Sequence, residues 1–486
     1  MSLIFPSLWC SRRPSAVDSG SGGQSTFGTS KGAAEFGACG CSDKRCFVCM
    51  MDRRRFPSGI LESSILEILS LVKPTEDDRQ KRLHIINEFR AVVQSVESLR
   101  GALVEPFGSF VSNLYTRWGD LDISVDVPNG SLVPSVGKRR KQTLLRDIMR
   151  ALRRNGVYSL EFIPNARVPL LIYQGNYRNT SCDISICNLL GQIKSKFMLW
   201  ITEIDERFRD MVLLIKEWAK AKAINDPKNG TLNSYSLCLL VIFHFQTCNP
   251  AILPPLKDIY VGNIADDLTG TRLIVERHIQ DTCAANIARF KYQRFHQVNQ
   301  SSLSELFVTF FEKFSREEFL SNQYAICTYS GRLESITSQE KWMQKNHKIL
   351  IEDPFEMPDN AARAVSMNGL ERISGAFEET NRMLSSRTVD RNHLMTSLVR
   401  PHIRPSIGVR TPHINSRIGA RAPQDTFNTP TRVSHPVVTP IHERFTQAMQ
   451  LQSRPSSSTV SVQGHGAVQR VQRQGRQQWR PRPNNF

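Results

Sequence analysis

The sequence predicts an α+β protein in which a small α/β domain is inserted into a helical domain, with disordered tails at both ends. Apolar residues recur at a helical period over residues 56–100 and 199–372. Between them, residues 101–198 contain short segments in which apolar and polar residues alternate, as they do in strands. Residues 1–55 and 373–486 show neither pattern, so we expect both to be disordered.

Length, charge and cysteine content limit the classes of function. The chain has 486 residues and a net charge of +18, which suits a two-domain protein that binds a polyanion. Eleven cysteines without regular spacing favour free thiols in a reducing compartment. The longest apolar run, Leu237–Phe245, is too short for a membrane span, so no membrane association is expected. A secretory signal is not expected, although the Ser-rich, acid-poor start leaves an organellar transit peptide as an alternative.

The first tail contains four closely spaced cysteines, Cys39, Cys41, Cys46 and Cys49. Their spacing makes them a candidate zinc site, but no apolar residues surround them to form a small core. Met51 directly follows the cluster and precedes the first helical pattern. Translation from Met51 would leave the cysteines outside the mature protein, so both starts remain open.

The first folded segment, residues 56–100, is predicted to form two helices of the helical domain. The apolar stripe of the first helix is Leu61, Ile65, Ile68, Leu69 and Val72, and that of the second is Leu83, Ile86, Phe89, Val92, Val93 and Val96.

The next segment carries the most informative pattern of the chain. From Leu121 onward, apolar residues alternate with Asp122, Ser124 and Asp126, which predicts a strand with one buried face. Since residues i and i+2 of a strand share a face, Asp120 and Asp122 should lie together. Carboxylates placed in this way can bind hard divalent cations. The Gly108-Ser109 turn, eleven residues upstream of Asp120, offers N–H groups and a hydroxyl to phosphate oxygens.

A third carboxylate should come from a neighbouring strand. The run Ser181–Cys187 alternates in the same way and contains Asp183. Two metal ions about 3.5–4 Å apart can activate an attacking hydroxyl and stabilise a leaving pyrophosphate, so the three aspartates predict a phosphoryl-transfer site. A lone D-x-D pattern would be better interpreted as surface carboxylates on a half-exposed sheet.

The rest of the α/β domain should contain one helix and two further strands. The helix is expected around Leu144–Leu152, where basic residues flank the apolar positions, and the strands at Leu160–Ile163 and Leu170–Tyr173. From residue 199 the helical period returns. Lys216 and Lys220 are four residues apart there, so they share one helix face.

Together, Gly108-Ser109, Asp120-x-Asp122 and Asp183 resemble the signature of the DNA polymerase β-like nucleotidyltransferases. Three further runs, Leu213–Lys220, Gly230–Ser236 and Ile351–Glu356, resemble the noncanonical poly(A) polymerases and terminal uridylyltransferases. The resemblance covers about residues 56–372. Within this branch, residues 104–125 look most like the plant small-RNA terminal uridylyltransferases.

The resemblance implies a nucleotidyltransferase that depends on Mg²⁺ or Mn²⁺. Asp120 and Asp122 would hold both ions, and Asp183 would help to hold the one beside the primer's 3′-OH. That oxygen would attack the α-phosphate in line, and pyrophosphate would leave. Positioning and charge neutralisation should dominate the rate, as in phosphoryl transfer generally.

The resemblance also implies a set of nucleotide contacts. Phosphate would be bound by Gly108, Ser109, Lys216, Lys220 and Ser234, the ribose 2′-OH by Asn188, and the base would stack on Tyr235. On the residues alone, the two lysines would be interpreted as a solvated helix face and Tyr235 as a core aromatic residue.

Base choice should depend on the segment that begins at Asp353. Asp353 and Glu356 match the base-recognition loop of the family, and Asp359 follows them. Some uridylyltransferases of the branch carry a histidine at that position, which helps to reject ATP, so this chain departs from their pattern. A preference for UTP therefore rests on the resemblance to the plant branch, and Asp359 can offer an acceptor to uracil N3–H. The alternative role for these acids is capping of a helix start.

The second tail is basic. Residues 391–486 contain fourteen arginines and two acids, a net charge of +12, and no lysine follows Lys348. A stretch rich in Pro, Gln and Ser cannot bury a core, so the arginines are free to contact RNA phosphates or a protein partner. The alternative is an inert solvated tail.

We therefore expect a template-independent RNA terminal uridylyltransferase that uses UTP. The resemblance implies unmethylated small RNAs and Argonaute-cleaved fragments as substrates whose decay it promotes, and Argonaute as a partner. It also implies a monomer in the nucleus and cytoplasm, including cytoplasmic RNA granules. One alternative is a poly(A) polymerase of the same fold. The other is an inactive RNA-binding scaffold, which the presence of all three carboxylates and both lysines disfavours.

Overall fold

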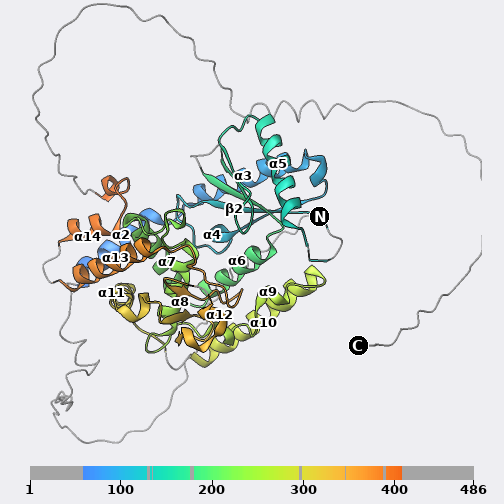
Figure 1. Cartoon of the computed structure of the whole chain (residues 1–486). Helices are drawn as coiled ribbons and strands as arrows, with labels where there is room; N and C mark the ends of the chain where they lie inside the picture. Colours follow the sequence, from blue (N-terminus) through green and yellow to red (C-terminus); the bar gives the residue numbers. More distant parts are fainter. Residues whose placement is uncertain are drawn as a thin grey trace, which may run out of the picture. The chain divides into compact units, whose positions relative to one another are not determined.

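The structure is a computed structural model that describes residues 58–407, apart from 129–131, 134, 176–179, 295–297, 345 and 387–389 (Figure 1). The cysteine cluster, Met51 and the arginines beyond residue 407 lie outside the described residues. None of the described helices is long and apolar enough to cross a bilayer.

A five-stranded mixed sheet forms the α/β domain, in the order β1-β2-β5-β4-β3. Its strands are β1 (Leu103–Phe107), β2 (Leu121–Asp126), β3 (Leu160–Ile163), β4 (Leu170–Gln174) and β5 (Ser181–Ile186). β2 and β5 run parallel, while the other neighbours are antiparallel. Strands β2 to β5 form where the alternation predicts them and α5 (Lys138–Arg154) where a helix is expected, whereas β1 was not predicted.

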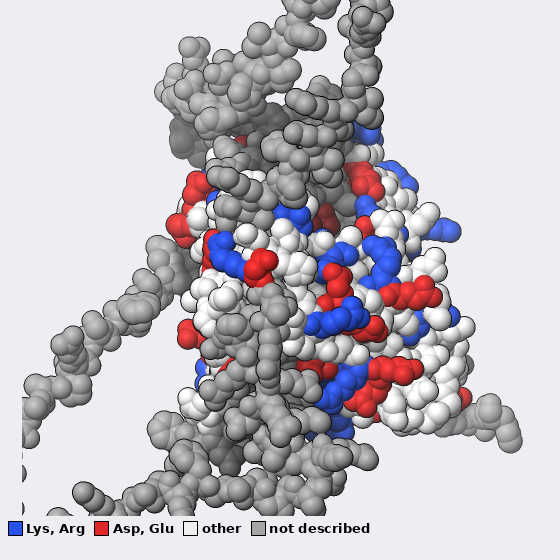
Figure 2. All heavy atoms as spheres, turned by 90° about the vertical axis from the view of Figure 1, so that its left-hand side faces the viewer, with Lys and Arg blue, Asp and Glu red and all other residues white. Residues whose placement is uncertain are grey.

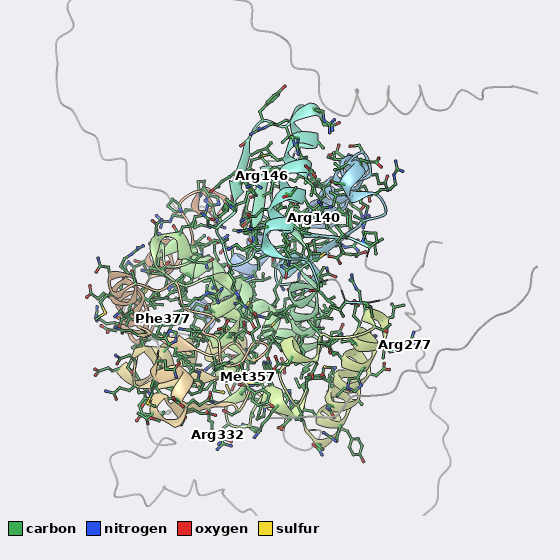
Figure 3. All side chains as sticks on the ribbon, turned by 45° about the vertical axis from the view of Figure 1, so that its right-hand side comes forward. Arg140, Arg146, Arg277, Arg332, Met357 and Phe377 are labelled. Atoms are coloured by element: carbon green, nitrogen blue, oxygen red, sulfur yellow. The ribbon has the colours of Figure 1, made fainter. Side chains whose placement is uncertain are left out.

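Two helices cover one face of this sheet, α3 (Glu76–Gln94) and α5 (Lys138–Arg154). The apolar side of β2 packs with them, since Ile123, Phe89 and Ile148 belong to one buried cluster. Arg140 and Arg146 lie on the outer side of α5, exposed to solvent (Figure 3).

The other face of β2 is also buried, so the predicted single buried face is wrong. Ser124 and Asp126 are almost fully buried, and the Ser124 hydroxyl donates to Asp126. Gln192 Nε2 and Arg272 Nη1 also donate to Asp126, each over 2.8 Å. The polar residues alternate as predicted, but the helical domain covers them with matching donors instead of leaving them to water.

The helical domain is built mainly from long helices around a second apolar core. Its helices and the short helix α4 are α2 (Ser58–Val72), α4 (Gly108–Val111), α6 (Leu189–Thr202), α7 (Glu206–Ala221), α8 (Ser234–Gln246), α9 (Ile264–Asp267), α10 (Arg272–Gln293), α11 (Leu303–Phe314), α12 (Glu340–Met343), α13 (Met367–Ser385) and α14 (Arg391–Leu398). Single 3₁₀ turns lie at Glu97–Leu99, Pro227–Asn229, Leu256–Asp258, Glu317–Leu320, Ile336–Ser338 and Arg404–Ile407. Aromatic residues dominate this core: Trp218 lies edge-on to Phe311 and Phe377, with ring centroids 4.7 and 4.8 Å apart. Figure 3 shows Phe377 within this domain.

The segment 56–100 divides between the two cores. α2 packs on α7 in the helical core, whereas α3 packs on β1 and α5. α6, which crosses the predicted boundary at 198, buries Leu189, Ile193 and Phe197 in the helical core. α3, which was predicted for the helical domain, therefore packs in the core of the α/β domain. α6, most of which was predicted for the α/β domain, packs in the core of the helical domain.

A three-stranded sheet interrupts the predicted helical pattern. It pairs β6 (Tyr324–Cys327) with β7 (Arg332–Ser335) and with β8 (Leu350–Ile351). The strands have only two to four residues, too few for their alternation to stand out in the sequence. β8 leads directly into the segment that contains Asp353.

Residues 373–407 were predicted to be part of a disordered tail, and this is wrong. α13 and α14 pack on the helical core, where Leu394, Met395 and Leu398 are buried. Arg400 forms a bidentate ion pair with Glu217, which is fully buried on α7. On the face shown in Figure 2, basic and acidic side chains are interspersed.

Candidate active site

The three predicted catalytic carboxylates meet at one edge of the α/β sheet. In the parallel pairing of β2 and β5, Asp122 lies directly opposite Asp183. Asp120 immediately precedes β2 and is exposed to solvent. Adjacent parallel strands thus bring together side chains that are more than 60 residues apart in the chain.

The Gly108-Ser109 turn packs directly on Asp122. Gly108 adopts a positive φ of 68°, and a Cβ built there would lie 1.9 Å from Asp122 Oδ2, so only glycine fits. The Ser109 N–H donates to the Asp122 carboxylate, while the Gly108 N–H donates to Ser195 Oγ over 2.6 Å. The turn predicted to bind phosphate therefore lies beside the carboxylates.

Burial and mutual repulsion perturb these carboxylates. Burial raises the pKa of Asp122 to about 7, and the charges of Asp183 and Asp120 contribute to the increase. Burial also raises the pKa of Asp183 to about 6, with a further contribution from Asp120. Like charges held this close favour any ligand that brings positive charge to the site.

The donor set fits a hard divalent cation, which prefers carboxylate oxygen ligands. Among the described residues, no three His, Cys, Asp or Glu side chains are grouped closely enough to coordinate an ion as they stand. Asp122 accepts a hydrogen bond from the Ser109 N–H, which offsets part of the increase in its pKa that burial and the charges of Asp183 and Asp120 cause. A cation would offset the same repulsion, so Mg²⁺ or Mn²⁺ suits these residues.

Both predicted phosphate lysines lie on α7 and face the carboxylates, so the solvated-face interpretation is wrong. Lys216 is buried and donates to the Leu114 carbonyl oxygen over 2.7 Å. Lys220, one turn later, is largely buried, which together with the charge of Arg400 lowers its pKa. The positive charge of Lys216 offsets part of the increase in the pKa of Asp122. The negative charge of Asp120 offsets part of the decrease in the pKa of Lys220. The helix therefore supplies positive charge beside the carboxylate edge.

Asn188 and Ser234 both lie at helix starts. Asn188 caps α6, its side chain accepting from the Gly191 N–H over 3.2 Å. Ser234 is the first residue of α8, and its hydroxyl donates to Asn225 Oδ1 over 3.1 Å. Their predicted contacts with ribose and phosphate stay predictions.

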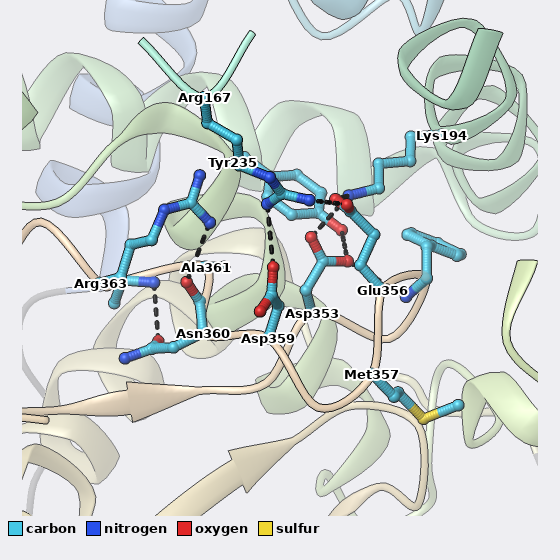
Figure 4. Close-up of polar contacts among 12 residues, drawn as sticks. Arg167, Lys194, Tyr235, Asp353, Glu356, Met357, Asp359, Asn360, Ala361 and Arg363 are labelled. Atoms are coloured by element: carbon cyan, nitrogen blue, oxygen red, sulfur yellow. Dashed lines mark hydrogen bonds and ion pairs between the residues drawn. The ribbon is translucent and has the colours of Figure 1, made fainter. Parts of the chain in front are cut away.

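The predicted base-recognition residues form one compact turn (Figure 4). The Asp353 N–H donates to the Asp359 carbonyl oxygen, and the Asp359 N–H to that of Glu356, each over 2.8 Å. Tyr235 Oη donates to Asp353 Oδ1 over 3.0 Å, which joins the predicted stacking ring to the turn. No described helix starts in this turn, and the next one begins at Met367, so the alternative of helix capping is wrong.

Two basic residues in this cluster were missed by the sequence interpretation. Lys194 of α6 forms ion pairs of 2.6 Å with both Asp353 and Glu356. Arg167, between β3 and β4, pairs with Glu356 and with Asp359. No sequence signal marks either residue, since more than 150 positions separate them from their partners.

The comparisons with known proteins agree with this geometry. A family model described as the central palm domain of mitochondrial-like poly(A) RNA polymerase matches residues 61–201. The fold is similar to that of Cid1 in complex with the UTP analogue UMPNPP, with a TM-score of 0.55 and 22% identity over 71% of this chain and 100% of that one.

Two proteins with similar sequences support the same family assignment. The terminal uridylyltransferase cid1 of Schizosaccharomyces pombe is 26% identical over 347 residues, which cover 66% of this chain and 78% of cid1. The protein HESO1 of Arabidopsis thaliana is 54% identical over 348 residues, 71% of this chain and 68% of HESO1. The chain therefore belongs to the family of RNA-terminal nucleotidyltransferases that contains the poly(A) RNA polymerases and the terminal uridylyltransferases.

Proposed function

We propose that this enzyme adds UMP from UTP to RNA 3′ ends without a template. The main observation that supports nucleotidyl transfer is the strand register, which sets Asp122 opposite Asp183. Asp120 and the Gly108-Ser109 turn lie beside this pair. The choice of UTP is supported by the resemblance of residues 104–125 to the plant small-RNA terminal uridylyltransferases, and by the similarity to cid1.

In this proposal the residues of the edge have distinct tasks. Asp120, Asp122 and Asp183 would hold divalent cations, which would supply charge neutralisation and lower the pKa of the attacking hydroxyl. Lys216 and Lys220 compensate the charge of the triphosphate from the side of α7. Tyr235, fixed through its hydroxyl to Asp353, offers a ring for the base to stack on.

The substrates would be small RNAs with an unmethylated 3′ end and Argonaute-cleaved fragments, whose decay uridylation promotes. Argonaute would be the partner that presents them to a monomeric enzyme. The enzyme would act in the nucleus and cytoplasm, including cytoplasmic RNA granules. These assignments follow from the resemblance to the plant branch.

One assay tests the nucleotide. Purified full-length protein, a short RNA with a free 3′-OH and each NTP alone should give extension mainly with UTP. A poly(A) polymerase is the competing function, since the poly(A) RNA polymerase cid11 of Schizosaccharomyces pombe is also 26% identical. Preferred extension with ATP would establish that competing function instead.

A second assay tests the RNA. An RNA with a 2′-O-methyl group on its last nucleotide should be extended much less than its unmethylated twin. The methyl group crowds the attacking 3′-OH and removes the 2′-OH donor, in a site where small displacements are costly. Equal extension of both RNAs would leave only a general RNA uridylyltransferase.

A further inference from the structure

The outer side of α5 carries a dense set of basic residues that the candidate active site does not use. Eight of the 17 residues of this helix are lysine or arginine, and one, Asp147, is acidic. Its apolar side, which includes Leu144, Leu145 and Ile148, is buried in the core of the α/β domain. The exposed side consists mainly of basic residues, here named the α5 basic face: Lys138, Arg139, Arg140, Arg146, Arg150, Arg153 and Arg154.

The charge of this face is compensated only in part within α5. Asp147 forms an ion pair with Arg150 and also accepts a hydrogen bond from the Ser98 hydroxyl over 2.7 Å. Arg146 lies over the Phe162 ring, with the guanidinium carbon 5.1 Å from the ring centroid. This contact uses the flat side of the guanidinium, so the N–H groups at its edge remain available. The face therefore offers several guanidinium groups to an anionic partner.

The spacing of the arginines suits a long anion. Arg139, Arg146 and Arg153 follow one another at intervals of seven residues, about two helical turns, so they lie along the same side of α5. With a rise of 1.5 Å per residue, this row is about 21 Å long. A single small anion could contact only one part of it, whereas a polymer with regularly spaced charges could follow its whole length.

One end of α5 lies beside the loop that borders the candidate active site. Lys138 Nζ donates to the Asn165 carbonyl oxygen over 3.3 Å, and Gln142 Nε2 donates to that of Pro164 over 3.0 Å. Two residues after Asn165, Arg167 pairs with Glu356 of the base-recognition turn. A polymer whose end lies at the carboxylates could therefore continue over this loop and along α5.

The other end of α5 is followed by an exposed aromatic ring. Tyr158 comes four residues after Arg154 and is 83% exposed. Basic residues combined with an exposed aromatic side chain favour single-stranded nucleic acid, whose bases can stack on the ring. An acidic protein segment would use the charge but not the ring. A membrane surface does not fit, because the apolar side of α5 is buried and cannot enter lipid.

We propose that the α5 basic face binds the single-stranded part of the RNA upstream of the reacting 3′ end, with Tyr158 stacking on one of its bases. The proposal rests on the proposed function, since the bound strand is the RNA whose end is extended. Six of the seven residues of the face are arginines, whose planar fork of N–H groups matches the oxygens of a phosphate.

The main test replaces the row of arginines in the full-length protein by Arg139→Gln, Arg146→Gln and Arg153→Gln together. Fluorescence anisotropy with a labelled single-stranded RNA should show affinity lower by about 10-fold or more, and KM for RNA should rise in parallel. The slope of log affinity against log salt should fall by about 2, because each lost phosphate contact contributes about 0.7. KM for UTP should not change. A dinucleotide, too short to reach along α5, should be extended as well by the variant as by the wild type.

A matched control removes the same charge elsewhere. Arg277 and Arg289 of α10 and Arg332 of β7 are exposed, and Figure 3 shows Arg277 and Arg332 on the helical domain, away from Arg140 and Arg146. Replacing all three by glutamine should leave the RNA affinity and its salt slope close to those of the wild type. Melting temperatures show which variants are folded.

Tyr158→Ala separates stacking from charge. It should lower RNA affinity by about 5-fold or more, because one stacked base is lost, while the salt slope stays the same because no charge is removed. Since the side chain is exposed, this variant keeps the test open if the triple arginine variant does not fold.

The outcomes separate the surface from the proposed function. Unchanged RNA affinity and salt slope in the α5 variant would overturn the proposal and leave an acidic protein segment as the partner of this face. An equal loss in the control variant would also overturn it, because net charge alone would then explain the binding. If the α5 variant loses RNA binding but the wild type does not add UMP to RNA, the proposed function fails while the binding surface stands.

Discussion

The candidate active site contains two groups of three acids that are stabilised in opposite ways. At the sheet edge, Asp120, Asp122 and Asp183 act on one another, and burial with this repulsion raises the pKa of Asp122 and of Asp183. In the turn at 353–359, the acids are instead paired with Lys194 and Arg167. The negative charge of the first group would be compensated by a ligand that brings positive charge. The negative charge of the second group is compensated by Lys194 and Arg167 of the protein itself.

This difference predicts how the two groups respond to substitution. Neutralising a carboxylate of the edge removes repulsion, so the fold should tolerate it while catalysis should not. Removing a cation from the turn leaves buried acids without compensation, so the fold itself should suffer. Stability and activity measured together therefore distinguish a ligand-dependent site from a self-compensated one.

The largest effect is expected at the sheet edge. Asp122→Asn should lower RNA extension by roughly 10³-fold or more, because a ligand of the cations is lost. Its melting temperature should stay the same or rise, because a repelling buried charge is removed. Extension with a radiolabelled nucleotide and a thermal melt of the same preparation measure both quantities. A strongly destabilised Asp122→Asn protein would contradict the claim that repulsion among the carboxylates of the sheet edge lowers the stability of the fold.

The next effect concerns another self-compensated pair, which joins α7 to the residue after α14. Arg400→Ala leaves Glu217 fully buried without its guanidinium, which should cost about 3 kcal/mol of unfolding free energy. Urea unfolding measures this loss, and Arg316→Ala, whose ion pair with Glu312 is exposed, is the control. Equal unfolding free energies for the two variants would show that Glu217 is compensated by other groups.

A smaller loss of stability is expected in the base-recognition turn. Lys194→Met should lower the unfolding free energy by about 1–3 kcal/mol, since Asp353 stays buried without its ammonium partner while Glu356 keeps Arg167. Unfolding in urea should show this loss, in contrast to Asp122→Asn. If Lys194→Met were as stable as the wild type, the turn would not depend on its own cations.

The two groups also differ in how far the sequence predicts them. The aspartates of the edge follow from strand alternation and the Gly108-Ser109 turn, because these patterns are local. The pairing of Lys194 with Asp353 spans 159 positions and depends on how α6 meets the turn after β8. Nothing local separates Lys194 from Lys196 on the same helix. The strands β6 to β8 and the docking of α14 were missed for the same reason, since tertiary contacts decide both.

The smallest effect is expected from the arginine-rich end of the chain. Eleven arginines and two acids follow residue 407, whereas Arg400 precedes it and anchors the folded part. Truncation after Ile407 should therefore leave both acid groups intact, while truncation near residue 375 would remove the Glu217 partner and unfold part of the helical core.

The Ile407 truncation should raise KM for RNA a few-fold and leave KM for UTP and the melting temperature unchanged. For each RNA phosphate that the tail neutralises, its removal should also reduce the slope of log affinity against log salt by about 0.7 for single-stranded RNA. At saturating RNA, turnover should approach that of the full chain, because the groups that perform the chemistry all precede the cut. Unchanged RNA affinity and salt dependence would exclude the tail as an RNA-binding segment and direct attention to a protein partner such as Argonaute.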